Sequence, residues 1–422
     1  MLDIKFIREN ADSIKTGAKK KHLQVNIDKL LVVDEKRRAL LAEVETMRAR
    51  QNESNDAMVK ANPGERVDIV AAMKRLKESL QKKEEELKTL DHEWQLLMVS
   101  VPNIPDLSVP EGASDADNKE VRVWGEKPVI QNPKSHVDLM QALDIADFER
   151  GTKVSGFRGY ILKGDGALLN MAVWSFVMNH FVKKGGFTPL LVPSLVKKVA
   201  FLGTGYLPQG EEDLYKTQDG DYLAGTGEVA TMAYYMNETL DKKNLPLKFV
   251  SFSPCFRREA GSHGKDTKGL MRVHEFFKFE QVVLCEASHE ESVRLHEELT
   301  QNAEELLQAL NLPYHVVINC GGDLGLGQVK KYDIETWVPS EGKYRETHSS
   351  SYFHDFQTRR LNIRYRDESG AMQYAHSLNN TALATPRILI SILENNQNED
   401  GSIIIPEVLR PYMGKDKIEK VV

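Results

Sequence analysis

The sequence predicts an α+β protein in which a long helical hairpin precedes a body built on an antiparallel sheet with flanking helices. Two patterns carry this prediction. Apolar residues repeat at heptad spacing over residues 27–98, and the remainder alternates short β-rich runs with fewer helical stretches. The chain has 422 residues, of which 41% are hydrophobic and 28% charged. It is therefore too long for one ordinary core and too apolar to be disordered.

The heptad pattern occupies two runs, separated by Asn62-Pro63-Gly64. Proline and glycine stop a helix and turn the chain, so we expect an antiparallel coiled-coil hairpin over about 27–98. At 1.5 Å per residue, a run of about 30 residues makes an arm on the order of 45 Å long. Residues 1–22 are expected to form a short amphipathic helix. Taken alone, these first hundred residues favour a dimerisation or scaffold coiled coil, and only the rest of the chain reverses that interpretation.

Composition changes again after the heptads. Residues 101–120 are rich in proline and in small or acidic residues, which indicates a linker. We therefore expect an N-terminal domain over 1–100, a linker over 101–120 and a body over 121–422. In the body, helices are predicted at about 167–184, 289–310 and 386–397, and strands at 248–256, 273–285 and 360–366.

Charge and cysteine content exclude several classes of protein. The net charge of −6 gives no overall attraction to a polyanion, so any nucleic-acid contact must be local. Cys255, Cys285 and Cys320 are too widely spaced for a disulfide framework or a C-x-x-C zinc pair, so no zinc is expected. The N-terminus lacks an apolar signal core, and no apolar run approaches the roughly 20 residues of a membrane helix. We expect a soluble, cytoplasmic protein without a membrane partner.

The segment Phe256–Glu280, FRREAGSHGKDTKGLMRVHEFFKFE, has two β-like flanks around a loop rich in glycine, serine, lysine and aspartate. Side chains alternate along a strand, so Arg257 and Glu259 are expected on one face of the first flank. The second flank presents four residues on one face: Arg272, His274, Phe276 and Glu280. Guanidiniums bind phosphate, a ring stacks on a base, and carboxylates accept from amines, which together suit ATP and an amino acid. The alternative is a surface hairpin with solvated ion pairs.

A second informative segment is Leu378–Gln397. Thr385 is expected to be the N-cap of a helix, with Pro386 at its first position. Arg387 then lies in the first turn, where the helix dipole disfavours a cation. An anionic partner is therefore expected, and phosphate suits a helix N-terminus. A structural carboxylate is the alternative.

These segments resemble the signature motifs of class II aminoacyl-tRNA synthetases. FRREAG with RVHEFFKFE is similar to the second motif, and ATPRILISILE is similar to the third. The helix at 167–184 with GGFTPLLVPSLVK resembles the first, which forms the homodimer interface in that family, with Pro193 at the matching proline. The stretches VPNIPDLSVPEGASDADN, FLGTGYLPQGEEDLYKT, SHGKDTKGL, DFQTRRLNIRYR and MLDIKFIREN are similar to bacterial-type seryl-tRNA synthetases. The resemblance extends over essentially the whole chain.

The resemblance implies a ligase that activates L-serine with ATP, releases pyrophosphate and transfers serine to tRNA(Ser), and to tRNA(Sec) where it is present. The helical arm would bind the tRNA across a homodimer. One alternative is a catalytically altered paralogue that binds RNA or protein. Another is a ligase that loads a carrier protein, which would lack the arm and use zinc.

The resemblance also implies roles for individual residues. The catalytic candidates are Arg257, Arg272 and Arg387, which would hold the phosphates of ATP. The implied ATP-binding set is Arg257, Arg258, Glu259, Arg272, Phe276, Glu346, Thr347, His348, Ser349 and Arg387. Within that set, Mg²⁺ is expected on Glu346 and Ser349, which offer the oxygen ligands that a hard cation prefers. The implied serine pocket comprises Thr226, Gly227, Glu228, Glu280, Asn379 and Thr381.

Some positions depart from the family pattern. Gly227 stands where the triplet TAE is common, and Thr381 stands where serine is frequent. Asn380 and Ala382 replace the glycines of LNGSGLA, which raises the question of whether the pocket is narrowed or re-aimed. His348 and Tyr352 likewise differ from the common ISSCSN stretch.

Overall fold

The computed structural model describes residues 1–262, 264 and 266–420, which divide into two units. The first comprises Met1–Lys19 and Leu23–Pro102, and the second comprises Lys20–His22 and the chain from Asn103 onward. Most of the stretch predicted as a linker thus belongs to the second unit. Its last two residues begin strand β1 (Lys119–Trp124).

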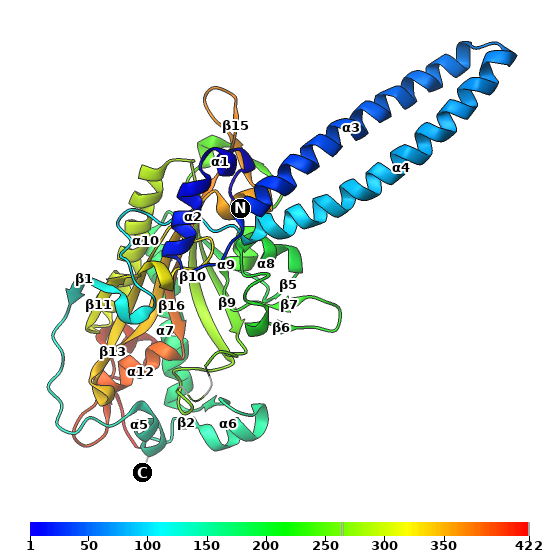
Figure 1. Cartoon of the computed structure of the whole chain (residues 1–422). Helices are drawn as coiled ribbons and strands as arrows, with labels where there is room; N and C mark the ends of the chain where they lie inside the picture. Colours follow the sequence, from blue (N-terminus) through cyan, green and yellow to red (C-terminus); the bar gives the residue numbers. More distant parts are fainter. Residues whose placement is uncertain (263, 265, 421–422) are drawn as a thin grey trace. The chain divides into compact units, whose positions relative to one another are not determined.

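The first unit is helical, and it contains the predicted hairpin. Figure 1 shows the two long helices α3 (Ile27–Lys60) and α4 (Pro63–Ser100) running side by side. The single helix predicted over 1–22 is wrong, because two helices form there, α1 (Ile4–Glu9) and α2 (Ala11–Lys20). Asn10 ends the first of them, with its side-chain amide donating to the Phe6 carbonyl at 3.0 Å.

The hairpin turns at a capping box. The Asn62 side chain accepts from the backbone N–H groups of Gly64 and Glu65, and the Glu65 carboxylate accepts from the Asn62 N–H. These bonds satisfy N–H groups that a helix start leaves free. Away from the turn, Val44, Leu80 and Leu87 form a small buried cluster between the two helices.

The second unit is built on an eight-stranded sheet with the order β1-β11-β12-β13-β16-β10-β9-β4. All neighbours are antiparallel except β4 and β9, which are parallel. Beyond β1, the strands are β11 (Tyr314–Ile318), β12 (Lys330–Val338), β13 (Lys343–His354), β16 (His376–Thr385), β10 (Glu275–Cys285), β9 (Leu247–Phe256) and β4 (Thr188–Leu191). The predicted α+β architecture on an antiparallel sheet is confirmed.

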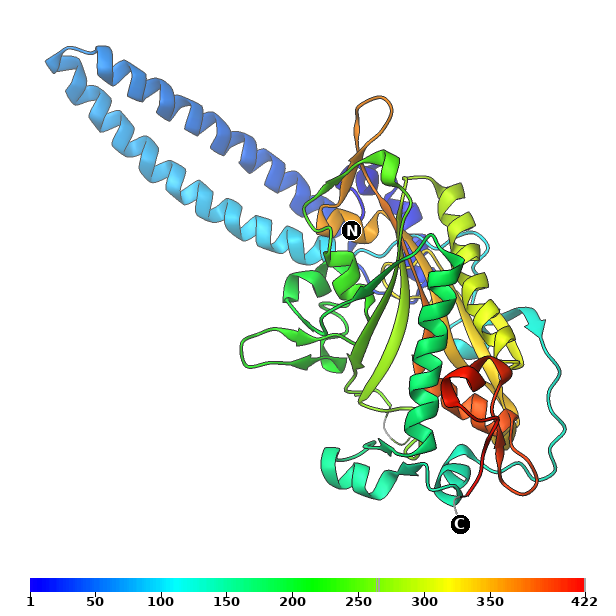
Figure 2. The ribbon, with the colours of Figure 1, turned by 180° about the vertical axis from the view of Figure 1, so that it is seen from behind.

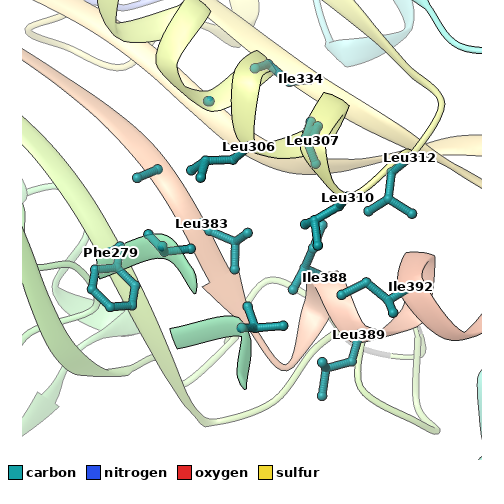
Figure 3. Close-up of a cluster of buried hydrophobic side chains, with 14 of the residues drawn as sticks. Phe279, Leu306, Leu307, Leu310, Leu312, Ile334, Leu383, Ile388, Leu389 and Ile392 are labelled. Atoms are coloured by element: carbon teal, nitrogen blue, oxygen red, sulfur yellow. The ribbon is translucent and has the colours of Figure 1, made fainter. Parts of the chain in front are cut away.

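Helices α7 (Asp165–Lys184), α10 (His289–Ala309) and α12 (Arg387–Asn395) supply the main core together with one face of the sheet. Figure 2 shows α7 lying along the sheet. In Figure 3, Leu306 and Leu307 of α10 lie near Ile388 of α12, with Leu383 of β16 beside them. Each such side chain contributes about 1.5–3 kcal/mol when it leaves water.

Smaller elements surround this core. The remaining helices are α5 (His136–Ala142), α6 (Phe148–Ser155), α8 (Lys198–Thr204), α9 (Glu228–Ala233), α11 (Phe356–Leu361) and α13 (Arg410–Met413). The short strands are β2 (Ala146–Asp147), β3 (Ile161–Leu162), β5 (Leu195–Val196), β6 (Tyr215–Lys216), β7 (Tyr222–Leu223), β8 (Thr239–Leu240), β14 (Arg364–Arg366), β15 (Met372–Tyr374), β17 (Ile403–Ile404) and β18 (Lys417–Ile418). Among the helices that the structure describes, none has the length together with the apolar character needed to cross a membrane.

Two local predictions are wrong. Thr385 is not an N-cap, because it is the last residue of β16 and pairs with Phe277. Its hydroxyl accepts from the Trp174 indole N–H at 2.8 Å. Pro386 takes the cap position of the helix. The strand predicted over 360–366 is shorter, since Asn362, with φ of 54°, ends helix α11 in the left-handed conformation. Only the stretch from Arg364 is extended there.

His315 of β11 links the edge strand β1 to β12. Its Nδ1 lies 2.8 Å from Glu120 Oε2, its Nε2 lies 2.7 Å from Glu335 Oε2, and its ring stacks on Tyr344. Burial disfavours charge on the ring, but hydrogen bonds and attraction from the two carboxylates outweigh it and raise the pKa of His315. Protonation lets both ring nitrogens donate at once.

We expect the contacts of His315 with Glu120 and Glu335 to make the free energy of unfolding depend on pH. A raised histidine pKa contributes stability that is fully present below the unfolded value of about 6.5 and is lost as pH rises through the folded value. The melting temperature of His315→Gln should therefore fall furthest below that of the unmodified protein near pH 6, and the gap should narrow above about pH 6.5. Thermal melts at a series of pH values measure it. A difference in melting temperature that does not change with pH would contradict a stabilising role for protonated His315.

Candidate functional site

A cavity of about 500 Å³ opens on the face of the sheet opposite helices α7, α10 and α12. The floor of the cavity is formed by every second side chain of the sheet strands. On β16, Asn379 and Thr381 line the cavity, whereas Leu378 and Ala382 are buried in the main core. The cavity therefore collects the polar side chains of strands whose apolar side chains pack under α7, α10 and α12.

One end of the cavity gathers guanidinium groups. Arg387 is the first residue of α12; its Nε donates to the Met271 carbonyl at 3.1 Å and its Nη1 to the Glu346 carbonyl at 3.0 Å. Its side chain is 25% exposed, so the charge is only partly solvated. Desolvation lowers the pKa of Arg387, while the nearby Glu346 carboxylate opposes that change. An anion entering the cavity would offset this penalty, because an opposite charge nearby favours the charged guanidinium.

Arg272 and Arg257 complete this end. Arg272 donates from Nη1 to Glu259 at 3.2 Å and from Nε to Asp266 at 3.0 Å. Desolvation opposes its charge, but these two carboxylates prevail and raise the pKa of Arg272. The Arg257 guanidinium lies 5.2 Å from the centre of the Phe276 ring, a cation–π distance. A flat group could stack on this ring while anionic oxygens meet the guanidiniums.

The other end of the cavity holds two buried carboxylates. Glu280 accepts from the Thr226 hydroxyl at 3.4 Å and forms an ion pair with Lys278. Glu228 accepts from the Tyr206 hydroxyl at 2.8 Å and from the Gln357 amide at 2.6 Å. Burial, with a contribution from the charge of Glu280, raises the pKa of Glu228. These carboxylates suit an ammonium group.

A second cavity, of about 1140 Å³, adjoins the guanidinium end. Arg257, Arg272 and Arg387 line both cavities, and so do Glu259 and Glu346. The three arginines therefore stand where the two spaces meet. This position allows a group held in the first cavity to extend its charged end into the second.

Most residues singled out in the sequence come together here. The first cavity is lined by Glu228, Arg257, Glu259, Arg272, Phe276, Glu280, Glu346, Thr347, Ser349, Asn379, Thr381 and Arg387. Thr226 lines only the second cavity. Four residues line neither: Gly227, Arg258, His274 and His348.

Two of those exceptions, His348 and His274, have visible causes. The His348 ring is buried beside the Thr347 hydroxyl, at 2.8 Å, and burial lowers the pKa of His348 to about 4. His274, expected to share a face with Arg272, instead places Nδ1 2.9 Å from the Arg257 carbonyl. Both Arg272 and His274 precede β10, which begins at Glu275, so strand alternation does not govern their side chains.

The departures at 380 and 382 do not narrow the cavity, because both side chains lie on the opposite face of β16. Asn380 accepts from the Gln281 amide at 2.7 Å, and Ala382 belongs to the main core. The glycine at 227, where the family commonly has alanine, is explained by a neighbouring side chain. A Cβ at Gly227 would lie 2.7 Å from the Ser251 Oγ, closer than such contacts allow, so the serine occupies the space of the missing methyl group.

Several lining or supporting residues were missed from the sequence: Tyr206, Asp266, Lys278, Arg345 and Gln357. Lys278 lies two residues from both Phe276 and Glu280 on β10. Because side chains two apart in a strand point to the same face, the sequence could have predicted that Lys278 faces the cavity. Gln357 comes from α11, and no sequence pattern connects it to Glu228.

Glu346 and Ser349 both lie on β13 and both line the first cavity, as a magnesium site there requires. Carboxylate and hydroxyl oxygens are suitable donors for a hard cation that keeps several waters and binds phosphate oxygens. Within the described part of the chain, no three His, Cys, Asp or Glu side chains are placed to hold a metal by themselves.

Comparison with known proteins covers both units. Residues 1–105 match the seryl-tRNA synthetase N-terminal domain, and residues 215–396 match the tRNA synthetase class II core domain (G, H, P, S and T). The serine–tRNA ligase of Deinococcus radiodurans is 48% identical over 416 residues, which cover 98% of each chain.

Solved structures agree with this. The seryl-tRNA synthetase from Pyrococcus horikoshii complexed with ATP aligns with a TM-score of 0.90 and 38% identity over the whole of both chains. The cytoplasmic serine–tRNA ligase from Naegleria fowleri in complex with AMP aligns with a TM-score of 0.87 and 32% identity, over 100% of this chain and 99% of that one. On the full-length identity to these proteins, the chain belongs to the seryl-tRNA synthetase family.

Proposed function

We propose that this protein activates L-serine with ATP to give seryl-adenylate and pyrophosphate, and then transfers serine to tRNA(Ser). The observation that carries the proposal is the convergence of Arg257, Arg272 and Arg387 in one cavity with a stacking ring and a pair of buried carboxylates. ATP would occupy the guanidinium end and serine the carboxylate end. The activity of the full-length relatives supports the same assignment.

At the guanidinium end, adenine would stack on Phe276 and offer its amino group to Glu259, with Arg257 beside the α-phosphate. Arg272 and Arg387 would hold the terminal phosphates, which reach toward the second cavity. Serine's carboxylate attacks the α-phosphorus in line with the departing pyrophosphate. Charge spreads over the phosphoryl oxygens in that transition state, and fixed guanidiniums stabilise it without reorganising. Positioning and electrostatics therefore account for the chemistry, and no protein nucleophile is required.

At the carboxylate end, Glu280 and Thr226 would bind the serine ammonium, and Thr381 with Asn379 would bind its hydroxyl. Buried groups that need a hydroxyl partner reject alanine by roughly 10⁴ to 10⁵. Threonine must be excluded by space instead, because it also carries a hydroxyl. Tyr206 and Gln357 would keep Glu228 fixed beside this site.

Mg²⁺ bound with ATP would supply positive charge to the phosphates, and Glu346 with Ser349 would hold it. Both residues are on one strand, and the Glu346 carbonyl also accepts from Arg387. This strand thus joins the expected ion to the arginine that meets the terminal phosphate.

The α3–α4 arm would bind tRNA(Ser) by recognising the shape and backbone of the RNA, as double-stranded RNA is generally recognised. It would bind tRNA(Sec) in the same way where a cell contains it.

A homodimer would place the arm of one protomer beside the active site of its partner. Leu168, Met171, Val182 and Leu191, on α7 and β4, are exposed apolar residues suited to that interface. Charging of tRNA would take place in the cytoplasm. A catalytically altered paralogue is disfavoured, because the three arginines converge.

Arg387→Ala tests the catalytic assignment. It should lower serine-dependent ATP–pyrophosphate exchange by a factor on the order of 10² or more, because a fixed positive charge at the transferring phosphates is lost. Arg294→Ala is the matched control, since Arg294 pairs with Glu291 and Glu298 on the exposed side of α10. Thermal melting confirms that both variants fold. Near-normal exchange by Arg387→Ala would remove that residue from the mechanism.

Removal of residues 27–98, with a short glycine linker in their place, separates the two steps. Pyrophosphate exchange should persist, because every residue lining the two cavities lies outside the deleted range. Aminoacylation of tRNA(Ser) should be lost. Filter-binding charging assays with labelled serine measure the second step, and unimpaired charging would contradict the role of the arm.

The amino-acid preference can be measured by exchange with serine, threonine, alanine and cysteine in parallel. Serine should be preferred over alanine by several powers of ten in kcat/KM, because the pocket's buried polar groups lose their partner with alanine. Discrimination against threonine should be smaller if it rests on space alone. A stronger response to another amino acid than to serine would overturn the substrate assignment.

A further inference from the structure

The turn Gly325–Gln328 forms part of the cavity wall, and its backbone carbonyl groups have an unusual set of partners. Lys21 donates from Nζ to the carbonyls of Gly325 at 3.0 Å, Leu326 at 3.0 Å and Gln328 at 2.5 Å. The remaining carbonyl, that of Gly327, accepts from the Asn103 side-chain amide at 3.1 Å. Two residues far away in the sequence therefore bind all four carbonyl oxygens.

Asn103 makes two further bonds in the same place. Its backbone N–H donates to the Leu326 carbonyl at 2.9 Å, and its side-chain amide donates to the Phe353 carbonyl at 2.7 Å. Phe353 also lines the cavity. The Asn103 side chain, which is 4% exposed, thus ties the turn to the end of strand β13.

The turn Gly325–Gln328 also contacts the end of the cavity where serine is expected to bind. The Gln328 side chain accepts from the Gly325 N–H at 2.6 Å and donates to the Ser351 hydroxyl at 2.8 Å. Ser351 pairs in register with Asn379, one of the residues expected to bind serine. A shift of the turn would therefore be passed to the floor of that pocket.

Burying Lys21 is costly. The residue is only 2% exposed, and burial lowers the pKa of Lys21 to about 7. Within the described residues, no carboxylate forms an ion pair with it, and its three N–H groups go to the three carbonyls. A buried ammonium without an anionic partner stabilises a fold less than an apolar side chain of similar size. Its geometric role, the fixing of three carbonyl groups of one turn, is what an apolar residue could not supply.

We propose that Lys21 and Asn103 are positioning residues for the amino-acid end of the cavity, acting by holding the turn Gly325–Gln328 against Ser351 and Phe353. Neither touches the substrates. The inference rests on the proposed function, because it assigns that end of the cavity to serine. At the nucleotide end, Arg257, Arg272 and Phe276 come from segments that this turn does not contact. Only the expected magnesium residues Glu346 and Ser349 share strand β13 with Ser351.

Kinetics of ATP–pyrophosphate exchange test the proposal on the full-length protein. Lys21→Met keeps most of the side-chain volume and removes all three bonds, while Asn103→Ala removes two. Each should raise the KM for serine on the order of tenfold and leave the KM for ATP within about twofold, because a small displacement at one end of a site weakens only the group bound there. Lys248→Met is the matched control, since this half-buried lysine pairs with Glu298 away from the turn. It should change neither constant.

The outcomes separate the two claims. If the unmodified protein and Lys248→Met show no serine-dependent exchange, the proposed function fails. If they do, and both Lys21→Met and Asn103→Ala keep the original KM for serine, the positioning role is wrong. A rise of both KM values together, with a lower melting temperature, would show that the residues only stabilise the fold. Should Lys21→Met fold poorly, Asn103→Ala decides the question alone, because it leaves the Lys21 bonds in place.

Discussion

The two-sidedness of the central sheet is the constraint on which the site depends. Strands β10, β13 and β16 bury one set of side chains under three helices and present the alternate set to the cavity. A slip of one residue in any of these strands would exchange the two sets, so the apolar packing also determines which polar groups meet the ligand. The energy that fixes the active site thus comes mainly from residues that never touch a substrate.

Helix α12 extends this dependence to the phosphates. Its apolar side chains, such as Ile388 and Ile392, seat it in the core, and its first residue is Arg387. Near its other end, the buried Glu394 carboxylate accepts from the His136 N–H at 2.8 Å, and the His136 ring in turn accepts from the Leu270 N–H at 3.2 Å. Arg387 itself binds the carbonyl of the next residue, Met271. One helix therefore holds the same short segment from both of its ends.

The sequence alone predicts the features that arise from periodicity. The heptads predicted the hairpin of α3 and α4, and the strand alternation placed Phe276 and Glu280 on one face. Prediction failed where neighbouring segments compete for the same residue, as at Thr385, which pairs in the sheet and cannot cap the helix. It also failed just beyond strand ends. Glu259 reaches the cavity from a left-handed conformation with φ of 54°, not from a strand.

A further part of the site lay beyond sequence analysis because it depends on hydrogen bonds across the chain. Gln357 reaches Glu228, and Lys21 reaches the turn at Gly325, through contacts that leave no periodic trace. The individual binding roles of the cavity residues likewise stay predictions, since they derive from the family resemblance. The geometry adds which of those residues are close enough to act together.

The close approach of Gly227 and Ser251 has a consequence for the orientation of the serine hydroxyl. A methyl group at 227 would lie 2.7 Å from the Ser251 Oγ, and because that oxygen can rotate away, the contact restricts the rotamer of Ser251 and not the identity of the residue. In its present rotamer the Ser251 hydroxyl donates to the Glu280 carbonyl at 3.2 Å, so a methyl group at 227 would displace that hydrogen bond. The glycine at 227 thus preserves a bond to the backbone of Glu280, whose side chain lines the cavity.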